Sequence, residues 1–180
     1  MHNFFRKMKG GKTCPPRAPI SEIIISLLGG FIGIATIGLL GRWFQYEGTT
    51  LLFYIGSFGA TAVLVFGIPL SPFAQPRNMV GGQIVAALVG VSVYQFLPEP
   101  IFLSAALAVS LTIAVMHITR TLHPPAGATA LIAVIGSEQV HSLGYIYVLA
   151  PVLSGTIIML VIALFTNNLP ATRRYPQFWW

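Results

Sequence analysis

The residues best suited to chemistry in this sequence gather in one polar cluster around the stretch TRTLHPPAGATA. Its members are His117, Thr119, Arg120, Thr121, His123, Pro124, Pro125, Gly127 and Thr129. The cluster lies between two apolar runs, where irregular backbone and ionisable groups need internal partners because leaving them unpaired is costly. His123 and Arg120 are therefore candidates for binding a polar or charged solute. The alternative is a polar turn whose groups satisfy one another.

A second polar group follows the proline-rich stretch IPLSPFAQPRN. It consists of Gln75, Arg77 and Asn78, directly before Gly81 and Gly82. Its arginine and the arginine of the first cluster would attract anions and exclude cations if both lie near one entrance. The alternative is that both arginines anchor the chain at the cytoplasmic face of a membrane.

Metal binding and enzymatic catalysis are both poorly supported. His117 and His123 are six residues apart, and no carboxylate or thiolate lies near them to complete a metal site. His123 also lacks an acidic partner that would let it activate a nucleophile. Cys14 is the only cysteine, so no intrachain disulfide is possible. The sequence predicts neither an enzyme nor a bound metal or cofactor.

The elements that must position these residues belong in a lipid bilayer. Of the 180 residues 55% are hydrophobic and only 8% are charged, whereas soluble domains carry about 25% charged residues. Six apolar segments are expected to be helical and embedded in the membrane. They run from Glu22 to Arg42, Thr49 to Ile68, Met79 to Leu97, Ile101 to Thr119, Ala126 to Ile135 and Leu143 to Phe165.

The positive charges predict the orientation of these segments. Six segments put both termini on one side, together with the basic N-terminal tail, Arg77, Arg120, Arg173 and Arg174. An excess of Lys and Arg marks the cytoplasmic side, so both termini are expected to be cytoplasmic. Because much of the net charge of +6 lies in that tail, nucleic-acid binding is a poor explanation for it.

Two of the segments are expected to be broken. The segment from Ala126 to Ile135 covers about 15 Å of a hydrocarbon core about 30 Å thick, so it is predicted to be a half-helix reached through an extended His-Pro-Pro stretch. The segment from Thr49 to Ile68 is interrupted at Gly56, Ser57 and Gly59. Irregular backbone at membrane depth survives only inside protein or along a cavity.

The tetrapeptide GATA occurs in both broken segments, at 59–62 and again at 127–130, and each time an aliphatic run follows it. We therefore expect two inverted repeats of three segments, about 22–97 and 100–165, with solute held between the two breaks. Chance recurrence of small residues is the alternative.

Half-helices that begin near Gly59 and Gly127 would point unpaired backbone amides and positive dipole ends at the middle of the membrane. The hydroxyls of Thr61 and Thr129 would lie beside them. A small anion is the natural occupant of such a site.

Small residues at helical spacing predict close helix packing. Such pairs are Gly29 with Gly33 and Ser104 with Ala108. They suit either contacts within the chain or a subunit interface, so a homo-oligomer is one of the two alternatives. The C-terminal PQFWW is expected to anchor at the membrane interface.

The stretch TRTLHPPAGATALIAVIG resembles the signature of the HPP family, small integral membrane proteins named for the His-Pro-Pro that stands here as His123, Pro124 and Pro125. SPFAQPRNMVGGQ is also similar, and the resemblance covers the chain from about Pro19 to Asn168. Gln83 stands where many relatives have histidine. Some members are implicated in nitrite transport in cyanobacteria and chloroplasts, so the resemblance implies transport of nitrite or a similar small anion.

The sequence therefore predicts an all-α membrane protein with a basic tail at 1–20, a transmembrane domain at 21–168 and a C-terminal tail at 169–180, located in a bacterial, cyanobacterial-like inner membrane. The predicted anion-binding residues are Gly59, Thr61, Gln75, Arg77, Asn78, Arg120, His123, Pro124, Pro125, Gly127 and Thr129. The alternatives are a non-transporting membrane scaffold, a channel for another small anion, and proton-coupled uptake through a histidine.

Overall fold

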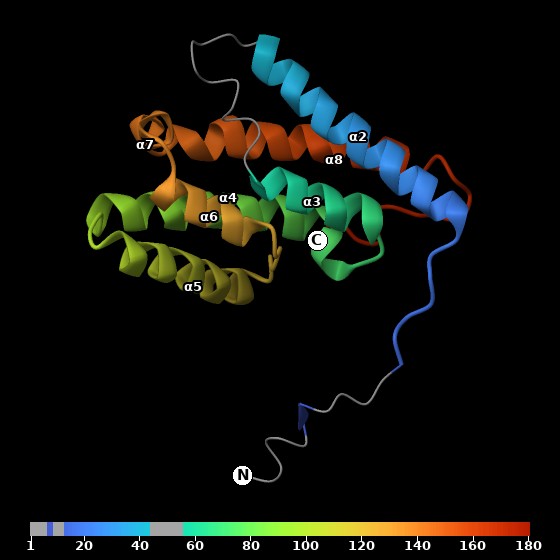
Figure 1. Ribbon diagram of the computed structural model, residues 1–180, viewed down its shortest axis with the longest axis horizontal. Helices are drawn as coiled ribbons and strands as arrows, with labels where there is room; N and C mark the ends of the chain where they lie inside the picture. The colour runs from blue at the N-terminus through green and yellow to red at the C-terminus, as the bar shows by residue number, and fades with distance from the viewer. Residues whose placement is uncertain (1–6, 9–12, 44–55) are drawn as a thin grey trace.

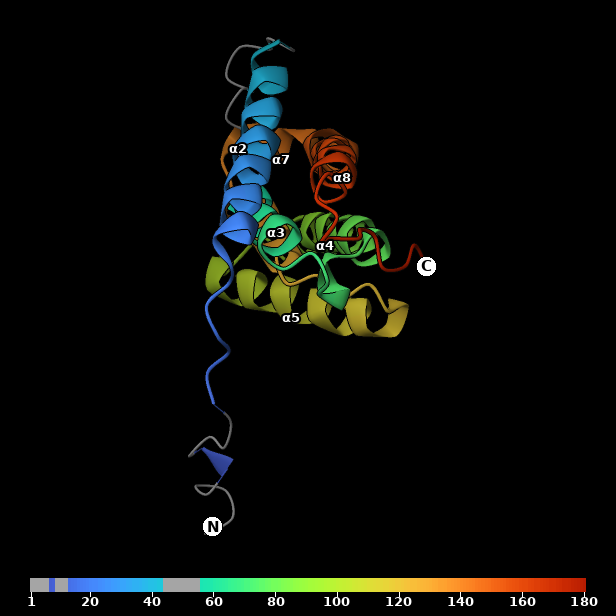
Figure 2. The same ribbon diagram turned by 90° about the vertical axis from the view of Figure 1, so that its right-hand side faces the viewer.

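The structure is a computed structural model that describes residues 7–8, 13–43 and 56–180, and within these ranges it contains helices and no strand. The helices are α2 (Ile20–Trp43), α3 (Gly56–Gly67), α4 (Pro76–Phe96), α5 (Ile101–Thr119), α6 (Ala126–Ile135), α7 (Glu138–Leu143) and α8 (Ser154–Thr166), with a 3₁₀ turn η2 (Pro72–Ala74) and a π-helical turn η3 (Val148–Leu153). Helices α3, α4 and α6 form a central layer with α5 on one side and α2 and α8 on the other (Figures 1 and 2).

Four helical stretches of the described chain are long and apolar enough to cross a membrane: Ile20–Leu39, Pro76–Phe96, Ile101–Thr119 and Val148–Thr166. Gly56–Gly67 and Ala126–Ile135 are shorter apolar helices. The outer helices direct large apolar side chains away from the protein, as the exposed fractions of Phe31 (71%), Phe102 (73%) and Ile118 (81%) show. A surface of this kind suits lipid rather than water.

Helix α2 contacts the rest of the protein through a narrow stripe that contains Gly29, Gly33 and Ile37. A Cβ added at Gly29 would lie 2.6 Å from a ring carbon of Phe66, and one added at Gly33 would lie 2.9 Å from the sulfur of Met159. Glycine at these positions therefore lets α3 and α8 approach α2. This pair of glycines makes an internal contact.

The closest packing of the central layer joins α4 to α6. A Cβ added at Gly90 would lie 2.7 Å from the carbonyl oxygen of Ala130, and Ala86 is completely buried in the same contact region. Small residues on both helices thus bring the two backbones together. This contact fixes the short α6 against a long helix.

Several predicted segments match the structure and others need correction. The predicted bounds of α5 and α6, Ile101 to Thr119 and Ala126 to Ile135, are those observed. The prediction that a half-helix starts at Gly59 is wrong, because α3 already includes Gly56 and helical backbone tolerates an interior glycine at a cost of about 1 kcal/mol. Residues 49–55 of that segment lie outside the described part.

The sixth segment is not one continuous helix. It is divided into α7, η3 and α8, with Ala150 in extended geometry (φ −138°, ψ 123°) before Pro151. Proline has no backbone N–H and disfavours a helical residue before it, which explains the interruption. The inverted repeat remains a prediction.

The C-terminal tail ties one end of the bundle together through Arg173, whose side chain is only 4% exposed. Its Nε donates to a carboxylate oxygen of Glu22 at 2.6 Å, and its two terminal nitrogens donate to Ser26 Oγ, Asn167 Oδ1 and the carbonyls of Glu22 and Phe66. These bonds use all five N–H groups of a guanidinium. The start of α2, the end of α3 and the end of α8 therefore meet at this end.

The same tail also holds η2. The hydroxyl of Tyr175 donates to the carbonyl of Ala74 at 2.7 Å, and the backbone N–H of Gln177 donates to Gln75 Oε1 at 2.7 Å. Gln75 in turn donates from its side-chain amide to the carbonyls of Pro69 and Ser71. The tail thus orders the loop that precedes α4.

Candidate functional site

A chain of hydrogen-bonded polar side chains crosses the central layer. His123 is completely buried, with Nδ1 2.8 Å from the carbonyl oxygen of Phe73 and Nε2 3.0 Å from Thr61 Oγ1. Gln83 Nε2 donates to Thr61 Oγ1 at 3.2 Å, and the hydroxyl of Thr129 donates to Gln83 Oε1. We call Thr61, Gln83, His123 and Thr129 the buried polar network. It joins α3, α4, α6 and the His-Pro-Pro loop.

The partners assign the direction of each hydrogen bond in this network. A carbonyl can only accept, so Nδ1 of His123 carries the hydrogen that points to Phe73. In a neutral imidazole Nε2 is then the acceptor, and the Thr61 hydroxyl donates to it. The bonds run in one direction, from Thr129 through Gln83 and Thr61 to His123 and Phe73. This arrangement is complete without a charge on the imidazole.

The two GATA repeats supply equivalent members of the network, because Thr61 and Thr129 are the third residue of each tetrapeptide. Both hydroxyls bind the same side-chain amide, that of Gln83 on α4. The hydroxyl of Tyr147, also completely buried, donates to the carbonyl of Thr129 at 3.3 Å. The sequence repeat thus places one hydroxyl on each side of a shared glutamine.

The loop before α6 reaches this position because α4 lacks side chains where the loop crosses it. A Cβ added at Gly82 would lie 2.7 Å from both His123 Cβ and the carbonyl oxygen of Thr121. Asn78, one turn earlier on α4, donates from Nδ2 to the carbonyl of Leu122 at 2.9 Å. Gly82 thus leaves room for the loop on α4, and Asn78 binds the loop by a hydrogen bond.

The first turn of α6 offers no free amide at its first three residues. The N–H groups of Ala126, Gly127 and Ala128 donate to the carbonyls of His123, Pro124 and Pro125, respectively. Pro125 has helical angles (φ −58°, ψ −24°), so the His-Pro-Pro stretch turns directly into the helix instead of staying extended. The expectation that these amides await an anion is wrong, because the turn satisfies them first.

The two arginines that were predicted to attract anions lie outside the network. Arg120 is exposed and ends α5 in the left-handed conformation (φ 58°). Arg77 is half-buried and donates from Nη2 to the carbonyl of Thr119 at 3.1 Å. Both therefore lie at the end of α5, on the rim of the loop that carries His123.

Some of the remaining predicted residues are buried and support the fold, and others lie at the surface. Gln75 is completely buried but commits its amide to neighbouring backbone. Gly59 and Pro124 are exposed, whereas Pro125 is buried beside the network and Gly127 is half-buried. Of the predicted set, the structure brings together Thr61, His123 and Thr129.

Sequence reasoning missed Gln83 as the link between the two threonines. A signal for it was present, because Gln83 is a polar side chain in the middle of the otherwise apolar run VGGQIVAALVG. Such a residue in a membrane helix faces the protein interior more often than lipid. The close approach of Phe73 could not be read from the sequence, since its contribution is a backbone carbonyl 50 residues away from His123.

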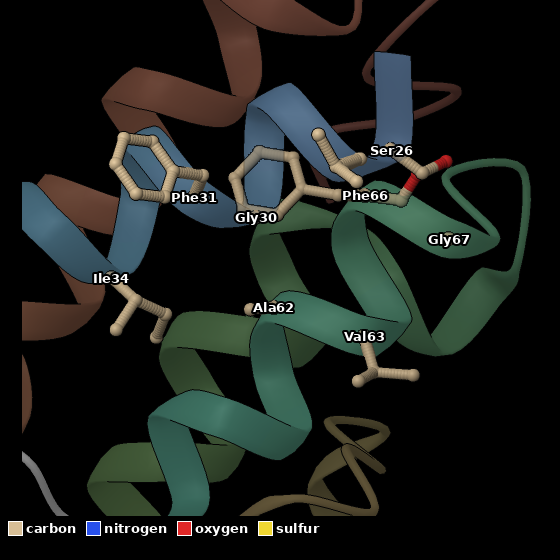
Figure 3. A pocket seen from close by; sticks show the side chains of 9 residues that line it. Ser26, Gly30, Phe31, Ile34, Ala62, Val63, Phe66 and Gly67 are labelled. Carbon is tan, nitrogen blue, oxygen red and sulfur yellow. The ribbon is translucent and has the colours of Figure 1, made fainter. Parts of the chain in front are cut away.

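A metal cluster and a surface groove are two other features that could bind a ligand. Within the described residues no three His, Cys, Asp or Glu side chains gather in a way that could hold a metal ion. A groove of about 430 Å³ lies between α2 and α3 and is lined by apolar groups such as Phe31, Ile34, Ala62 and Val63 (Figure 3). Its hydroxyl, that of Ser26, already donates to the carbonyl of Phe66. The groove suits hydrocarbon and offers little to a polar solute.

An apolar outer surface, several membrane-length helices and an interior polar network define a polytopic helical membrane protein. Comparison with known proteins agrees, since a family profile described as HPP, transmembrane region, matches residues 15–176. The chain belongs to the HPP transmembrane family.

Two transmembrane proteins of Dictyostelium discoideum are similar to almost the whole chain. One is 47% identical over 98% of this chain and 57% of its own length, and the other is 42% identical over 98% of this chain and 63% of its own length. The chain therefore spans about three fifths of the relatives that it matches. No solved structure matches it.

Proposed function

We propose that this protein transports a small monovalent anion across the membrane, and in the first place nitrite, through the region around the buried polar network. The observation that carries the proposal is the network itself. Four polar side chains from two short helices, a long helix and a loop meet inside an apolar bundle. Polar groups at such a depth are costly to bury and are candidates for a solute site by default.

The chemistry of the network favours an anion over a cation. Its side chains are hydroxyl, amide and imidazole groups, and none of its four members is a carboxylate. Arg77 and Arg120 lie at the rim of the loop that carries His123, where their charge would attract anions. Nitrite in particular rests on the resemblance of the His-Pro-Pro stretch to members implicated in nitrite transport.

A non-transporting scaffold is the second candidate, and a specific observation favours it. Both ring nitrogens of His123 already have partners, as does the amide of Gln83. A network that satisfies itself can serve to hold the helices in one arrangement. Transport then requires that some of these bonds open to admit the solute.

Nitrite flux into proteoliposomes of purified protein separates the two candidates. We expect saturable flux in the wild type and at least a tenfold loss in His123→Ala. His117→Ala is the matched control, because His117 is also a histidine but is exposed, in the last turn of α5. Thermal unfolding in detergent checks that each variant is folded. Folded wild-type protein that moves no small anion would make the scaffold the better conclusion.

The membrane that contains the protein and its orientation belong to the same proposal. We propose that both termini lie on the cytoplasmic side, in keeping with the joint position of the start of α2 and the C-terminal tail at one end of the bundle. Location in a bacterial inner membrane remains a prediction. The two similar proteins described above come from Dictyostelium discoideum. No catalytic role is proposed.

A further inference from the structure

One buried hydroxyl next to the network on α3 has no partner among the described residues. Ser57 on α3 is completely buried, and its Oγ makes no hydrogen bond in the described part of the chain. It precedes Thr61 by four residues, so the two side chains share one face of α3. Leaving a buried hydroxyl unpaired is unfavourable, and among the described residues only Ser57 and Thr112 have such a hydroxyl.

Gln83 supplies a second available donor. Its side-chain nitrogen carries two hydrogens, of which one is committed to Thr61. For the other, the described residues provide no acceptor within hydrogen-bond distance. By contrast, both nitrogens of His123 are committed, to Thr61 and to the carbonyl of Phe73. At the network, the donors without a committed partner among the described residues therefore belong to Ser57 and Gln83.

We propose that Ser57 and Gln83 contact the transported anion, and that His123 is a positioning residue that holds Thr61 between them. The proposal rests on the function proposed above and specifies its site. Thr61 is placed to do this, because it is four residues from Ser57 on the same helix and accepts a hydrogen bond from Gln83.

Such a site defines the class of anion. Its donors are a neutral hydroxyl and a neutral amide, so no opposite charge offsets the removal of the anion from water. The penalty for transferring an ion out of water rises steeply with its charge. The site is therefore suited to singly charged anions with exposed oxygen acceptors, such as nitrite, and unsuited to sulfate or hydrogenphosphate.

Ser57→Ala is the decisive variant because it removes a hydroxyl that makes no hydrogen bond to the described residues. Loss of one hydrogen bond to a charged ligand corresponds to a decrease of about 10- to 150-fold in the efficiency of nitrite flux. The melting temperature is expected to stay equal to that of the wild type or to rise. Thr112→Val is the matched control, since Thr112 Oγ1 is the other buried hydroxyl without a partner among the described residues and lies on α5, which gives nothing to the network.

Gln83→Glu gives a second test. A buried glutamic acid is neutral, so it can donate to Thr61 and accept from Thr129 while lacking only the additional N–H of glutamine. We expect a loss of nitrite flux comparable to that in Ser57→Ala. In the wild type, sulfate should fail to compete with nitrite for transport.

The outcomes separate this proposal from the function on which it rests. Saturable wild-type flux that is unchanged in both Ser57→Ala and Gln83→Glu overturns the assignment of these donors and leaves anion transport standing. The same result follows if Thr112→Val loses as much flux as Ser57→Ala. Absence of flux of any anion in folded wild-type protein overturns both proposals.

Discussion

Replacing Arg173 by methionine should destabilise the protein more than any other change in its C-terminal tail. Methionine has a similar length but cannot make the five hydrogen bonds of this 4% exposed guanidinium. Removing one partner of a buried ion pair costs about 3 to 5 kcal/mol. Because Glu22 is 26% exposed and regains water, the lower end of this range applies, about 3 kcal/mol. For a chain of this length that corresponds to a decrease in melting temperature of about 6 to 12 °C.

Thermal unfolding of the purified protein in detergent measures this decrease. Arg174→Met is the matched control, because the neighbouring arginine is exposed. The double variant Glu22→Gln with Arg173→Met should be less destabilised than the sum of its two single variants, since the carboxylate no longer lacks a partner. An Arg173→Met protein that melts within about 2 °C of the Arg174→Met protein would refute the reasoning.

Two further predictions concern packing and pH. Gly82→Ala should lower the melting temperature and nitrite flux together, because the added Cβ would lie 2.7 Å from His123 Cβ and from the Thr121 carbonyl oxygen. Gly59→Ala is the control, since the space around its added Cβ is open. In the same unfolding assay it should be neutral or stabilising by up to about 1 kcal/mol. Burial raises the pKa of Tyr175. The contribution of its protonated hydroxyl to the free energy of unfolding is therefore complete below the unfolded-state pKa of about 10, and it is lost as pH rises through the higher folded-state pKa. Tyr175→Phe should therefore cost about 1 kcal/mol at neutral pH, and melting curves above pH 10 should decline less steeply than in the wild type.

The helices were predictable to the extent that local sequence alone fixes them. The apolar runs of α5 and α6 have clear limits, a proline before the first and a double proline before the second, and the structure confirms both. The start of α3 was not predictable in the same way. The glycines in GSFGATA lower helix propensity, but packing of Phe58 against Gly155 on α8 favours the helical conformation there.

The candidate site was predictable in its residue types but only partly in its geometry. The repeated GATA indicated that Thr61 and Thr129 belong together, although the sequence suggested that helix amides would face the space between them. In the structure the amide of Gln83 fills that role for both hydroxyls. The positions of Phe73 and Arg173 depend on contacts across 50 and 107 residues of chain, respectively, and no local pattern encodes them.

A network that satisfies itself is compatible with transport if it opens at small cost. Gln83 is held by one bond to each threonine, and a neutral hydrogen bond contributes about 1 kcal/mol net. Breaking both therefore costs about 2 kcal/mol, which corresponds to an open state populated at about 3%. An anion that enters beside Gln83 and Ser57 only when these bonds are open shifts the population toward the open state. The closed arrangement thus pairs both threonines with Gln83, while the hydroxyl of Ser57 has no partner among the described residues and can accept a solute as its partner.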